Sequence, residues 1–431
     1  MDHSNAQRWI AIDSETGAVV GRGSTGHEAL QSARQALPNG LYTVGYEPDM
    51  GGTGLTLHPL LQEIAPILAT LDMPIYLVGG AVRDALLGKA SNDLDFVVPA
   101  NGIKTAFRIG DLLDKPAYPL DKSRDVGRVV LKEAGTYLDF AVYRGETLEE
   151  DLLDRDFTLN AMAIPALALT DAELIDPTGG WTDIGKETVR MVSNTALTND
   201  PLRMLRGVRM QLKFGFQLDP NTAKIIQKEG GQLSQTSNER VRDELINILR
   251  TGLGKGITLL DHLQLFSRII ELPPVEEETQ LSKIAALIDQ LGLSLSAGFE
   301  RFNPLIDEHL ARPITGNLTG YDQLLIEGIY YAASGDAKRS ESALKALQSH
   351  VEGDLKRLKF SAEMQKEGKR LLEARAAYRL LEVDFADKER TTRMIHRFWK
   401  RFTPIGLDLI RLRLAAGKEK DQAEEKLIVR L

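Results

Sequence analysis

The spacing of apolar and polar residues predicts a small mixed unit at the start of the chain. Three short apolar runs separated by turn residues are typical of strands, and a longer periodic stretch is typical of a helix. The strand candidates are RWIAID, GAVVGRG and LYTVGYE, and the helix candidate is 27–37. Residues 15–17 form a plausible hairpin turn, and the linker PDMGGTG at 48–54 follows. We therefore expect an accessory α+β unit and linker over residues 1–54, whose role the sequence leaves open.

A second α+β unit is predicted over residues 55–170. Its first segment, IYLVGGAVRDALLGKASNDLDFVV at 75–98, contains an apolar run that ends in two glycines, a short amphipathic stretch that stops at Gly88, and a second apolar run. This order predicts a strand, a tight turn, a helix and another strand. The remaining candidates are a helix at 103–113 and strands at 126–131 and 137–143.

Beyond Pro165 the pattern is helical almost throughout, apart from the turn DPTGG at 176–180, and no convincing strand follows Pro201. The long periodic segments are 238–249, 281–291, 355–381 and 390–402. We divide this part into a helical neck at 171–250, a body at 251–350 and a tail at 351–431. The expected fold class is therefore α+β, with a small mixed sheet in the first part and stacked helices in the second.

Composition narrows the class of protein. The chain has 431 residues, of which 43% are apolar, so it is long enough to bury a sizeable core. It contains no run of about 18 apolar residues, and its first residues lack the apolar core of a signal peptide. We therefore expect a soluble cytoplasmic protein with no membrane contact. The absence of cysteine excludes disulfides, thiolate metal ligands and a cysteine nucleophile.

The net charge of −8 is unevenly distributed. Residues 354–431 hold 20 basic and 13 acidic side chains, a local charge of +7, which leaves −15 on residues 1–353. A basic tail can follow a nucleic-acid backbone while the acidic remainder holds metal ions. A solvated helical surface rich in Lys, Glu and Arg would have the same composition.

Two acids open the second strand of the 75–98 segment. Because side chains alternate along a strand, Asp93 and Asp95 project from one face and can hold a divalent ion between them. The preceding Gly79 and Gly80 allow backbone amides to approach a phosphate closely. A lone pair of acids is usually just solvated, but the strand, glycine turn and helix before this pair make it a candidate metal and phosphate site.

A third carboxylate is expected at Asp139. In the strand candidate 137–143, alternation places Asp139 on one face together with Tyr137 and Ala141. It is therefore a candidate to act with the first two acids.

A second polar cluster is DRDFTLN at 154–160. Asp156 and Asn160 are four residues apart, so a helical turn would place them on one side, able to hydrogen-bond a hydroxyl or a backbone group. A helix N-terminus capped by an acid would produce the same pattern. Arg155 follows the acidic stretch 149–154, and a local ion pair would account for it.

A third cluster is DPLRMLRGVR at 200–209. Asp200 followed by Pro201 is a good helix start, with the acid as the N-cap. Three arginines then recur at every third position beside an apolar face: Arg203, Arg206 and Arg209. A solvated or ion-paired helix face would explain this stripe. If the helix lies inside the molecule, its arginines need partners, and triphosphates or bases can serve.

Together these clusters favour nucleotidyl transfer. Two carboxylates that hold Mg²⁺ polarise an α-phosphate and lower the pKa of an attacking hydroxyl, and a third can help hold a second ion or accept the proton. Cytosine and adenine present an amino donor beside a ring-nitrogen acceptor, whereas uracil and guanine present the reverse. A carboxylate beside a guanidinium, such as Asp200 with Arg203, would therefore accept C and A and reject U and G if the two residues face a base.

In order and spacing, these motifs resemble the class II tRNA nucleotidyltransferase and bacterial poly(A) polymerase family. The resemblance covers residues 75–249 and rests on GGAVRDALLG, DLDFVV, RDFTLNAMA, DPTGG, DPLRMLRGVR and SNERVRDEL. It implies a four-part, hook-shaped molecule with a nucleotidyltransferase-type head and a helical neck, body and tRNA-binding tail. It also implies addition of CMP or AMP, from CTP or ATP, to an RNA 3′ end without a nucleic-acid template.

The resemblance also implies roles for single residues. Asp93 and Asp95 would bind Mg²⁺, and Gly80 with Arg83 would contact the triphosphate. The residues that match the ribose-recognition segment are Arg155, Asp156 and Asn160. Those that match the nucleotide-recognition segment are Asp200, Arg203, Arg206 and Arg209. Asp139 is placed by strand geometry and family position together.

Three features depart from the family pattern. Asn199 stands where the family usually has Glu, which affects the orientation of the neighbouring arginine. Asp154 replaces the first arginine of the usual RRDFT and changes the charge near the ribose segment. The connection between Arg144 and Asp151 holds only residues 145–150. Family enzymes that complete CCA normally carry a longer flexible loop there, whereas relatives that add only CC have it shortened.

The resemblance therefore favours a CC-adding enzyme that acts on the tRNA 3′ end with CTP and Mg²⁺. Three alternatives remain open: full CCA addition with CTP and ATP, poly(A) polymerisation or A addition, and a catalytically silent RNA-binding protein on the same scaffold. The oligomeric state and the way in which addition terminates leave no trace in the sequence.

Overall fold

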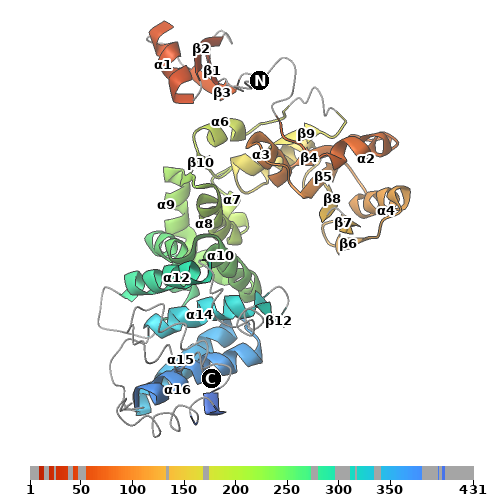
Figure 1. The fold of residues 1–431 in the computed structure, drawn as a ribbon. Helices are drawn as coiled ribbons and strands as arrows, with labels where there is room; N and C mark the ends of the chain where they lie inside the picture. The colour runs from red at the N-terminus through yellow and green to blue at the C-terminus, as the bar shows by residue number, and fades with distance from the viewer. Residues whose placement is uncertain are drawn as a thin grey trace, which may run out of the picture. The chain divides into compact units, whose positions relative to one another are not determined.

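The chain, described by a computed structural model, forms two compact units (Figure 1). The first comprises residues 1–199 and 215–222, and the second comprises residues 200–214 and 223–431. The structure describes residues 9–13, 19–23, 26–36, 42–46, 55–132, 135–167, 174–272, 280–296, 311–315, 318–333, 341–380, 397 and 400–402. Within these ranges, no helix has both the length and the apolar character needed to cross a membrane.

The expected N-terminal elements are all present. β1 (Trp9–Asp13) pairs antiparallel with β2 (Val19–Gly23) and with β3 (Tyr42–Tyr46), and α1 (Gly26–Ala36) joins β2 to β3 in the chain order. These bounds confirm the three strands and the helix that the apolar pattern predicts. The expected turn at 15–17 and the linker at 48–54 lie outside the described residues.

The largest sheet has six strands in the order β6-β7-β8-β5-β4-β9. Their bounds are Ala117–Asp121 (β6), Val126–Leu131 (β7), Thr136–Val142 (β8), Asp93–Val98 (β5), Tyr76–Val78 (β4) and Ala163–Pro165 (β9). β5 and β8 run parallel, and the other neighbouring pairs are antiparallel, so the predicted small mixed sheet is confirmed. The sequence pattern did not predict β6 and β9. β6 is a partly exposed edge strand that contains Pro119, and β9 has only three residues.

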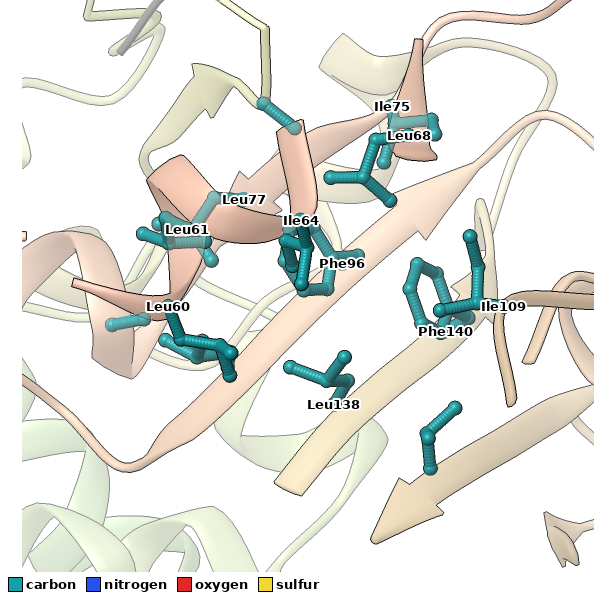
Figure 2. Packing of buried hydrophobic residues seen from close by; sticks show 14 of the residues in the cluster. Leu60, Leu61, Ile64, Leu68, Ile75, Leu77, Phe96, Ile109, Leu138 and Phe140 are labelled. Carbon is teal, nitrogen blue, oxygen red and sulfur yellow. The ribbon is translucent and has the colours of Figure 1, made fainter. Parts of the chain in front are cut away.

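Three helices pack on one face of this sheet: α2 (Leu60–Leu68), α3 (Gly80–Leu86) and α4 (Gly102–Leu113). Figure 2 shows residues of this core, including Ile64 of α2 and Ile109 of α4. Phe96 of β5 and Phe140 of β8 are at most 1% exposed in this core, and their rings stack with centroids 5.0 Å apart. Burying each such side chain contributes about 1.5–3 kcal/mol. Because neighbours alternate along a strand, Asp93, Asp95 and Asp139 lie on the opposite face.

A shorter helix covers part of that opposite face. Leu152 of α5 (Leu148–Leu153) is fully buried in one cluster with Val97 of β5 and Ala163 of β9. Val97 lies toward the C-terminal end of β5, whereas Asp93 and Asp95 lie at its N-terminal end. The candidate carboxylates are therefore on the half of the face beyond this cluster.

The rest of the first unit consists of short elements. They are a 3₁₀ turn at Thr158–Asn160, α6 (Gly180–Gly185), β10 (Thr188–Val189), α7 (Ala196–Asn199) and β11 (Gln217–Leu218). β10 and β11 pair in parallel.

The second unit is mainly helical. Its helices, with α9 at the boundary between the units, are α8 (Leu202–Phe214), α9 (Pro220–Glu229), α10 (Asn238–His262), α11 (Phe266–Ile269), α12 (Gln280–Ser296), α14 (Gly320–Ala333), α15 (Glu341–Arg357) and α16 (Ala362–Leu380). A 3₁₀ segment at Gly230–Gln235 precedes α10. The helices expected at 238–249 and 281–291 are confirmed.

Two expectations for this part are wrong. Strands do follow Pro201, namely β11, β12 (Pro313–Thr315) and β13 (Leu318–Thr319), but each has two or three residues, too few to show an alternating pattern. The helix expected at 355–381 is divided between α15 and α16. Lys359 between them has φ of 58°, a left-handed conformation that ends a helix. Of the segment 390–402, the structure describes 397 and 400–402, all helical.

Candidate active site

The two acids of β5 lie on one face of the sheet, as their spacing predicts. Asp93 is exposed and Asp95 is half-buried. In the parallel register Asp95 is paired with Asp139 of β8, so the fold brings all three predicted carboxylates together. Burial, followed by the negative charge of Asp139, raises the pKa of Asp95 to about 6, and the positive charge of Arg155 acts in the opposite direction.

Asp139 is held by Arg128, a residue that the sequence analysis did not single out. Arg128 lies opposite it in the antiparallel register, and its Nε and Nη2 atoms donate to the two carboxylate oxygens, each at 2.7 Å. This bond raises the pKa of the Arg128 guanidinium. The sequence could have indicated this ion pair, because a hairpin between the two predicted strands that pairs Leu131 with Thr136 also pairs Arg128 with Asp139.

The turn between β4 and α3 borders the carboxylates. Gly79 has φ of 70°, a conformation that glycine adopts without strain. A Cβ there would lie 2.9 Å from Nη1 of Arg155 and 4.0 Å from Oδ2 of Asp95. The turn is therefore in close contact with one predicted ribose-binding residue and close to one predicted metal ligand.

Gly80 begins α3, and Arg83 follows one turn later. Arg83 is 6% exposed, and it donates from Nη1 to Oδ1 of Asn160 at 2.5 Å and from Nε to Oδ1 of Asp84 at 2.9 Å. The fold thus connects the predicted triphosphate residue with the predicted ribose residue, which are 77 positions apart in the chain.

The DRDFTLN segment is held by two sets of contacts. Arg155 donates from Nε and Nη2 to Oδ2 of Asp151, at 3.0 and 2.8 Å, and this carboxylate is 1% exposed. The local ion pair that the acidic stretch suggested is confirmed. Asp156 accepts from Nδ2 of Asn160 at 3.0 Å and from the backbone nitrogen of Phe157 at 2.8 Å, so the four-residue spacing brings Asp156 and Asn160 together as expected.

Asp151 is a second residue that the sequence analysis did not single out. Besides holding Arg155, it accepts from the backbone nitrogen of Arg144 at 3.2 Å. It therefore links the start of the short connection after β8 to the ribose segment. Its position four residues before Arg155 could have indicated this ion pair. The stretch 149–154 contains four acids, however, so its charge alone did not show which acid binds the arginine.

The DPTGG turn and the helix after it pack against the DRDFTLN segment. Asp176 accepts from the backbone nitrogens of Gly180 and Trp181, at 2.8 and 2.9 Å, and so satisfies two backbone donors in the first turn of α6. A Cβ on Gly180 would lie 2.1 Å from the carbonyl oxygen of Thr158, which shows how closely α6 approaches the DRDFTLN segment. Thr158 also donates to Oδ2 of Asp183 at 2.6 Å.

The nucleotide-recognition candidates belong to the second unit. Asp200 accepts from the backbone nitrogen of Leu202 at 3.3 Å, which is the predicted N-cap contact, and from Nη2 of Arg240 at 2.9 Å. Arg209 donates from Nε to Oε1 of Glu244 at 2.5 Å. These contacts tie the start and the middle of α8 to α10.

The arginine stripe of α8 is half-buried. Each of its members lies between buried neighbours in the sequence: Arg203, Arg206 and Arg209. The apolar face that the sequence predicts is buried, and it includes Met204, Leu205 and Val208. The alternative of a solvated face does not fit these half-buried arginines, whereas the ion-paired alternative is confirmed at Arg209 by its bond to Glu244.

The described residues include no group of three or more His, Asp or Glu side chains arranged to hold a metal ion. Asp93 and Asp95 form a pair of oxygen donors, whereas Asp139 is bonded to Arg128. A pair of carboxylates fits Mg²⁺, which commonly binds one or two protein carboxylates and completes its shell with water and substrate phosphates.

Two family models match parts of the chain. Residues 75–147 and 120–190 match the model described as the poly A polymerase head domain. The matched part of the chain is similar to the head of the tRNA nucleotidyltransferase and poly(A) polymerase family. Residues 215–276 match the model of this family described as the probable RNA and SrmB-binding site of polymerase A.

Relatives in this family differ in the nucleotide that they add. A CC-adding tRNA nucleotidyltransferase from Synechocystis sp. is 40% identical over 200 residues, which are 46% of this chain and 47% of that protein. An A-adding tRNA nucleotidyltransferase from Deinococcus radiodurans is 37% identical over 213 residues, which are 48% of this chain and 47% of that protein. The chain spans about half the length of the curated relatives it matches.

A solved structure described as a tRNA-processing enzyme with CTP resembles this fold over most of its length. The TM-score is 0.64, and the match covers 85% of this chain and 90% of that chain at 23% sequence identity. At this level of identity, the likeness shows that the two proteins share a fold.

Proposed function

We propose that this protein adds C residues from CTP to the 3′ end of tRNA, without a template, by Mg²⁺-dependent nucleotidyl transfer. The observation that carries the proposal is the grouping of Asp93, Asp95 and Asp139 on one face of the sheet, between Arg155 and Arg128. The match to the polymerase head model and the described activities of the relatives support the part of the proposal that concerns nucleotidyl transfer to the tRNA 3′ end.

Asp93 and Asp95 would hold the metal ion. The raised pKa of Asp95 reflects burial and crowded negative charge, and a bound cation relieves that crowding. Mg²⁺ bound there supplies positive charge at the α-phosphate and makes an acceptor hydroxyl more acidic. The hydroxyl attacks the α-phosphate directly and pyrophosphate leaves, so the protein needs no nucleophile of its own.

The side chains next to the carboxylates would then act by positioning. Arg83 presents its guanidinium group to the triphosphate beside the glycine turn at Gly79 and Gly80. Arg155, which the buried Asp151 keeps beside Gly79, belongs with Asp156 and Asn160 to the ribose subsite. Because Arg83 and Asn160 are bonded to each other, the triphosphate and ribose subsites are fixed as one piece.

Recognition of the base would fall to α8. Asp200 with Arg203 matches the edge shared by cytosine and adenine and mismatches that of uracil and guanine. Arg240 donates to Asp200 and so holds its carboxylate in place.

The connection between β8 and α5 supports CC addition. Thr147 accepts from the backbone nitrogen of Glu150 at 3.2 Å, and Oε2 of Glu150 accepts from the backbone nitrogen of Glu146 at 2.6 Å. Gly145 packs so closely on Glu150 that a Cβ on the glycine would lie 2.6 Å from the Cβ of Glu150. A connection this short and this internally bonded is unlike the long flexible loop expected of enzymes that switch to ATP.

The proposal is tested with pure protein, Mg²⁺ and a tRNA transcript that lacks CCA, with CTP and ATP supplied singly and together. We expect growth by two residues with CTP, no further step with ATP, and no transfer in EDTA. A transcript that already ends in CC is the control for A addition. Growth by three residues would indicate a full CCA enzyme, and a single A on the CC transcript would indicate an A-adding enzyme. Long A tails on unrelated RNA would indicate a polymerase, and tRNA binding without transfer would indicate a silent RNA-binding protein.

A further inference from the structure

Tyr137 is an exposed aromatic side chain beside the candidate carboxylates. It is 37% exposed, although β8 is an inner strand of the sheet. In the parallel register it is paired with Asp93, and it shares a face of β8 with Asp139. Neighbouring strands are about 4.8 Å apart, so the ring lies within the length of one nucleotide of the proposed metal ligands.

Arg128 fixes this ring in place. The guanidinium carbon lies 4.8 Å from the centre of the Tyr137 ring. The same guanidinium is held by two bonds to Asp139, so it cannot turn away without breaking both. The exposed part of the ring is therefore a preorganised surface and needs little ordering when a ligand stacks on it.

The candidate carboxylates lie on β5 and β8, so the sheet continues past them in two directions. We call these two sides the β4 flank and the β8 flank. On the β4 flank lie Gly79 and Arg155, which the proposed function assigns to the triphosphate and ribose of the incoming nucleotide. On the β8 flank lie Tyr137 and Arg128. Nucleotidyl transfer brings two nucleotides to one metal site, the incoming triphosphate and the terminal nucleotide whose hydroxyl attacks it. With the first flank taken, the second is available to the acceptor.

We propose that Tyr137 stacks against the base of the 3′-terminal nucleotide of the acceptor RNA, with Arg128 as the residue that positions the ring. This inference rests on the proposed function for the place of the triphosphate. A stacking contact suits this acceptor, because the terminal base changes as nucleotides are added and every base has a π face that an aromatic ring can bind.

A binding measurement without any nucleotide tests the contact directly. The probe is a tRNA transcript lacking CCA, with 2-aminopurine as its 3′-terminal base, titrated with the full-length protein. Stacking on Tyr137 should quench the probe with the wild type and with Tyr137→Phe. Tyr137→Leu keeps an apolar side chain of strand-compatible size but has no ring, so the bound probe should stay bright.

Phe107→Leu is the matched control. Phe107 is 42% exposed, close to the exposure of Tyr137, but it lies on α4, the helix that covers the opposite face of the sheet. This variant also loses an exposed aromatic ring, but one that is far from the carboxylates. It should quench the 2-aminopurine probe as the wild type does. Equal melting temperatures of the Tyr137→Leu and Tyr137→Phe variants would show that loss of the ring, and not misfolding, changes the signal.

Steady-state kinetics give a second measurement. Tyr137→Leu should raise KM for the acceptor by about tenfold, the lower range for loss of one base–aromatic stack, and should leave KM for CTP within about twofold. Tyr137→Phe should restore the acceptor KM. Equal increases in both KM values, or a wild-type acceptor KM together with a quenched probe in Tyr137→Leu, would overturn the inference.

These outcomes separate the inference from the proposed function. If the wild type quenches the probe through Tyr137 but transfers no nucleotide, the acceptor contact stands and the proposed activity fails. If the wild type transfers nucleotides and Tyr137→Leu behaves like it in both measurements, the acceptor contact alone fails. If the wild type does not bind the transcript at all, both are overturned.

Discussion

At the scale of single residues, the proposed chemistry depends on three carboxylates that lie in different surroundings. Asp93 is exposed, Asp95 has a raised pKa, and Asp139 is bonded to Arg128. The negative charge of Asp139 contributes to the raised pKa of Asp95, while its oxygens are held by Arg128. This division of roles follows from strand pairing.

Replacing either proposed metal ligand should abolish transfer. Asp93→Ala or Asp95→Ala removes half of the donor pair, so we expect a loss of at least about a hundredfold in kcat, as is typical when a developing charge loses its stabilisation. The affinity for tRNA should stay nearly unchanged, because the metal serves the phosphate and not the tRNA body. Single-turnover transfer and filter binding measure the two properties. Asp111→Ala, an exposed acid on α4, is the control, and near-wild-type turnover in either site variant would refute the two-carboxylate site.

Replacing Arg203 should relax base selection. Arg203→Ala removes the donor expected to face the ring nitrogen of cytosine, so we expect the ratio of CTP to UTP incorporation to fall by about tenfold, the loss of one hydrogen bond to a charged group. Competition between the two nucleotides on one transcript measures this ratio. Lys213→Ala, an exposed cation on the same helix, should not change it. Unchanged selectivity in Arg203→Ala would mean that the base is recognised elsewhere.

At the scale of elements, close backbone contacts decide how the site segments meet. The DRDFTLN segment, α6 and the DPTGG turn are packed so that Gly180 almost touches the carbonyl of Thr158. The hairpin of β7 and β8 aligns Arg128 with Asp139 in the same way, through backbone pairing. The side chains of the site are thus positioned by elements that have little freedom to shift.

Gly180→Ala should therefore be destabilising and should reduce activity. Its Cβ would lie 2.1 Å from a backbone oxygen, so α6 must move, at a cost of about 1–3 kcal/mol in the free energy of unfolding. Gly353→Ala is the matched control, because Gly353 is exposed in α15 with no atom near its Cβ position, and it should stabilise by about 0.5–1 kcal/mol. Urea denaturation and transfer assays measure both. Equal stability of the two variants would contradict the close packing of α6.

At the scale of the whole molecule, the charge is divided between an acidic body and a basic C-terminal segment. The exposed cations in the described part of that segment include Arg397, Lys400 and Arg401 near its end. An acidic protein can bind RNA if its cations are gathered on one surface, because the affinity comes from local release of counterions.

Charge reversal in this segment should weaken tRNA binding. Replacing Arg397, Lys400 and Arg401 by Glu should lower the affinity and reduce the slope of log K against log salt by about two to three if each cation meets one phosphate. Binding titrations at several salt concentrations measure the slope. The control reverses three exposed lysines of the first unit, Lys89, Lys104 and Lys122, and so changes the net charge equally. An equal effect in the control would assign the change to net charge and not to the tail.

The sequence by itself determined the local features of this protein. Alternation along a strand placed Asp93 and Asp95 on one face, and the Asp200-Pro201 pair marked the start of α8 with its capping contact. The spacing of Asp156 and Asn160 indicated their hydrogen bond. Each of these follows from geometry within a few residues, and a chain segment carries that information wherever it lies in the fold.

Only the tertiary structure decided which distant segments meet. The parallel pairing of β5 with β8 set Asp139 beside Asp95, and the bond from Arg83 to Asn160 joined segments 77 residues apart. The role of Arg128 depended on strand register, and a shift by one residue would have turned its side chain to the other face. The contacts between distant segments, from Asp95 to Asp139 and from Arg83 to Asn160, are selected by the packing of the whole core, so no local pattern records them.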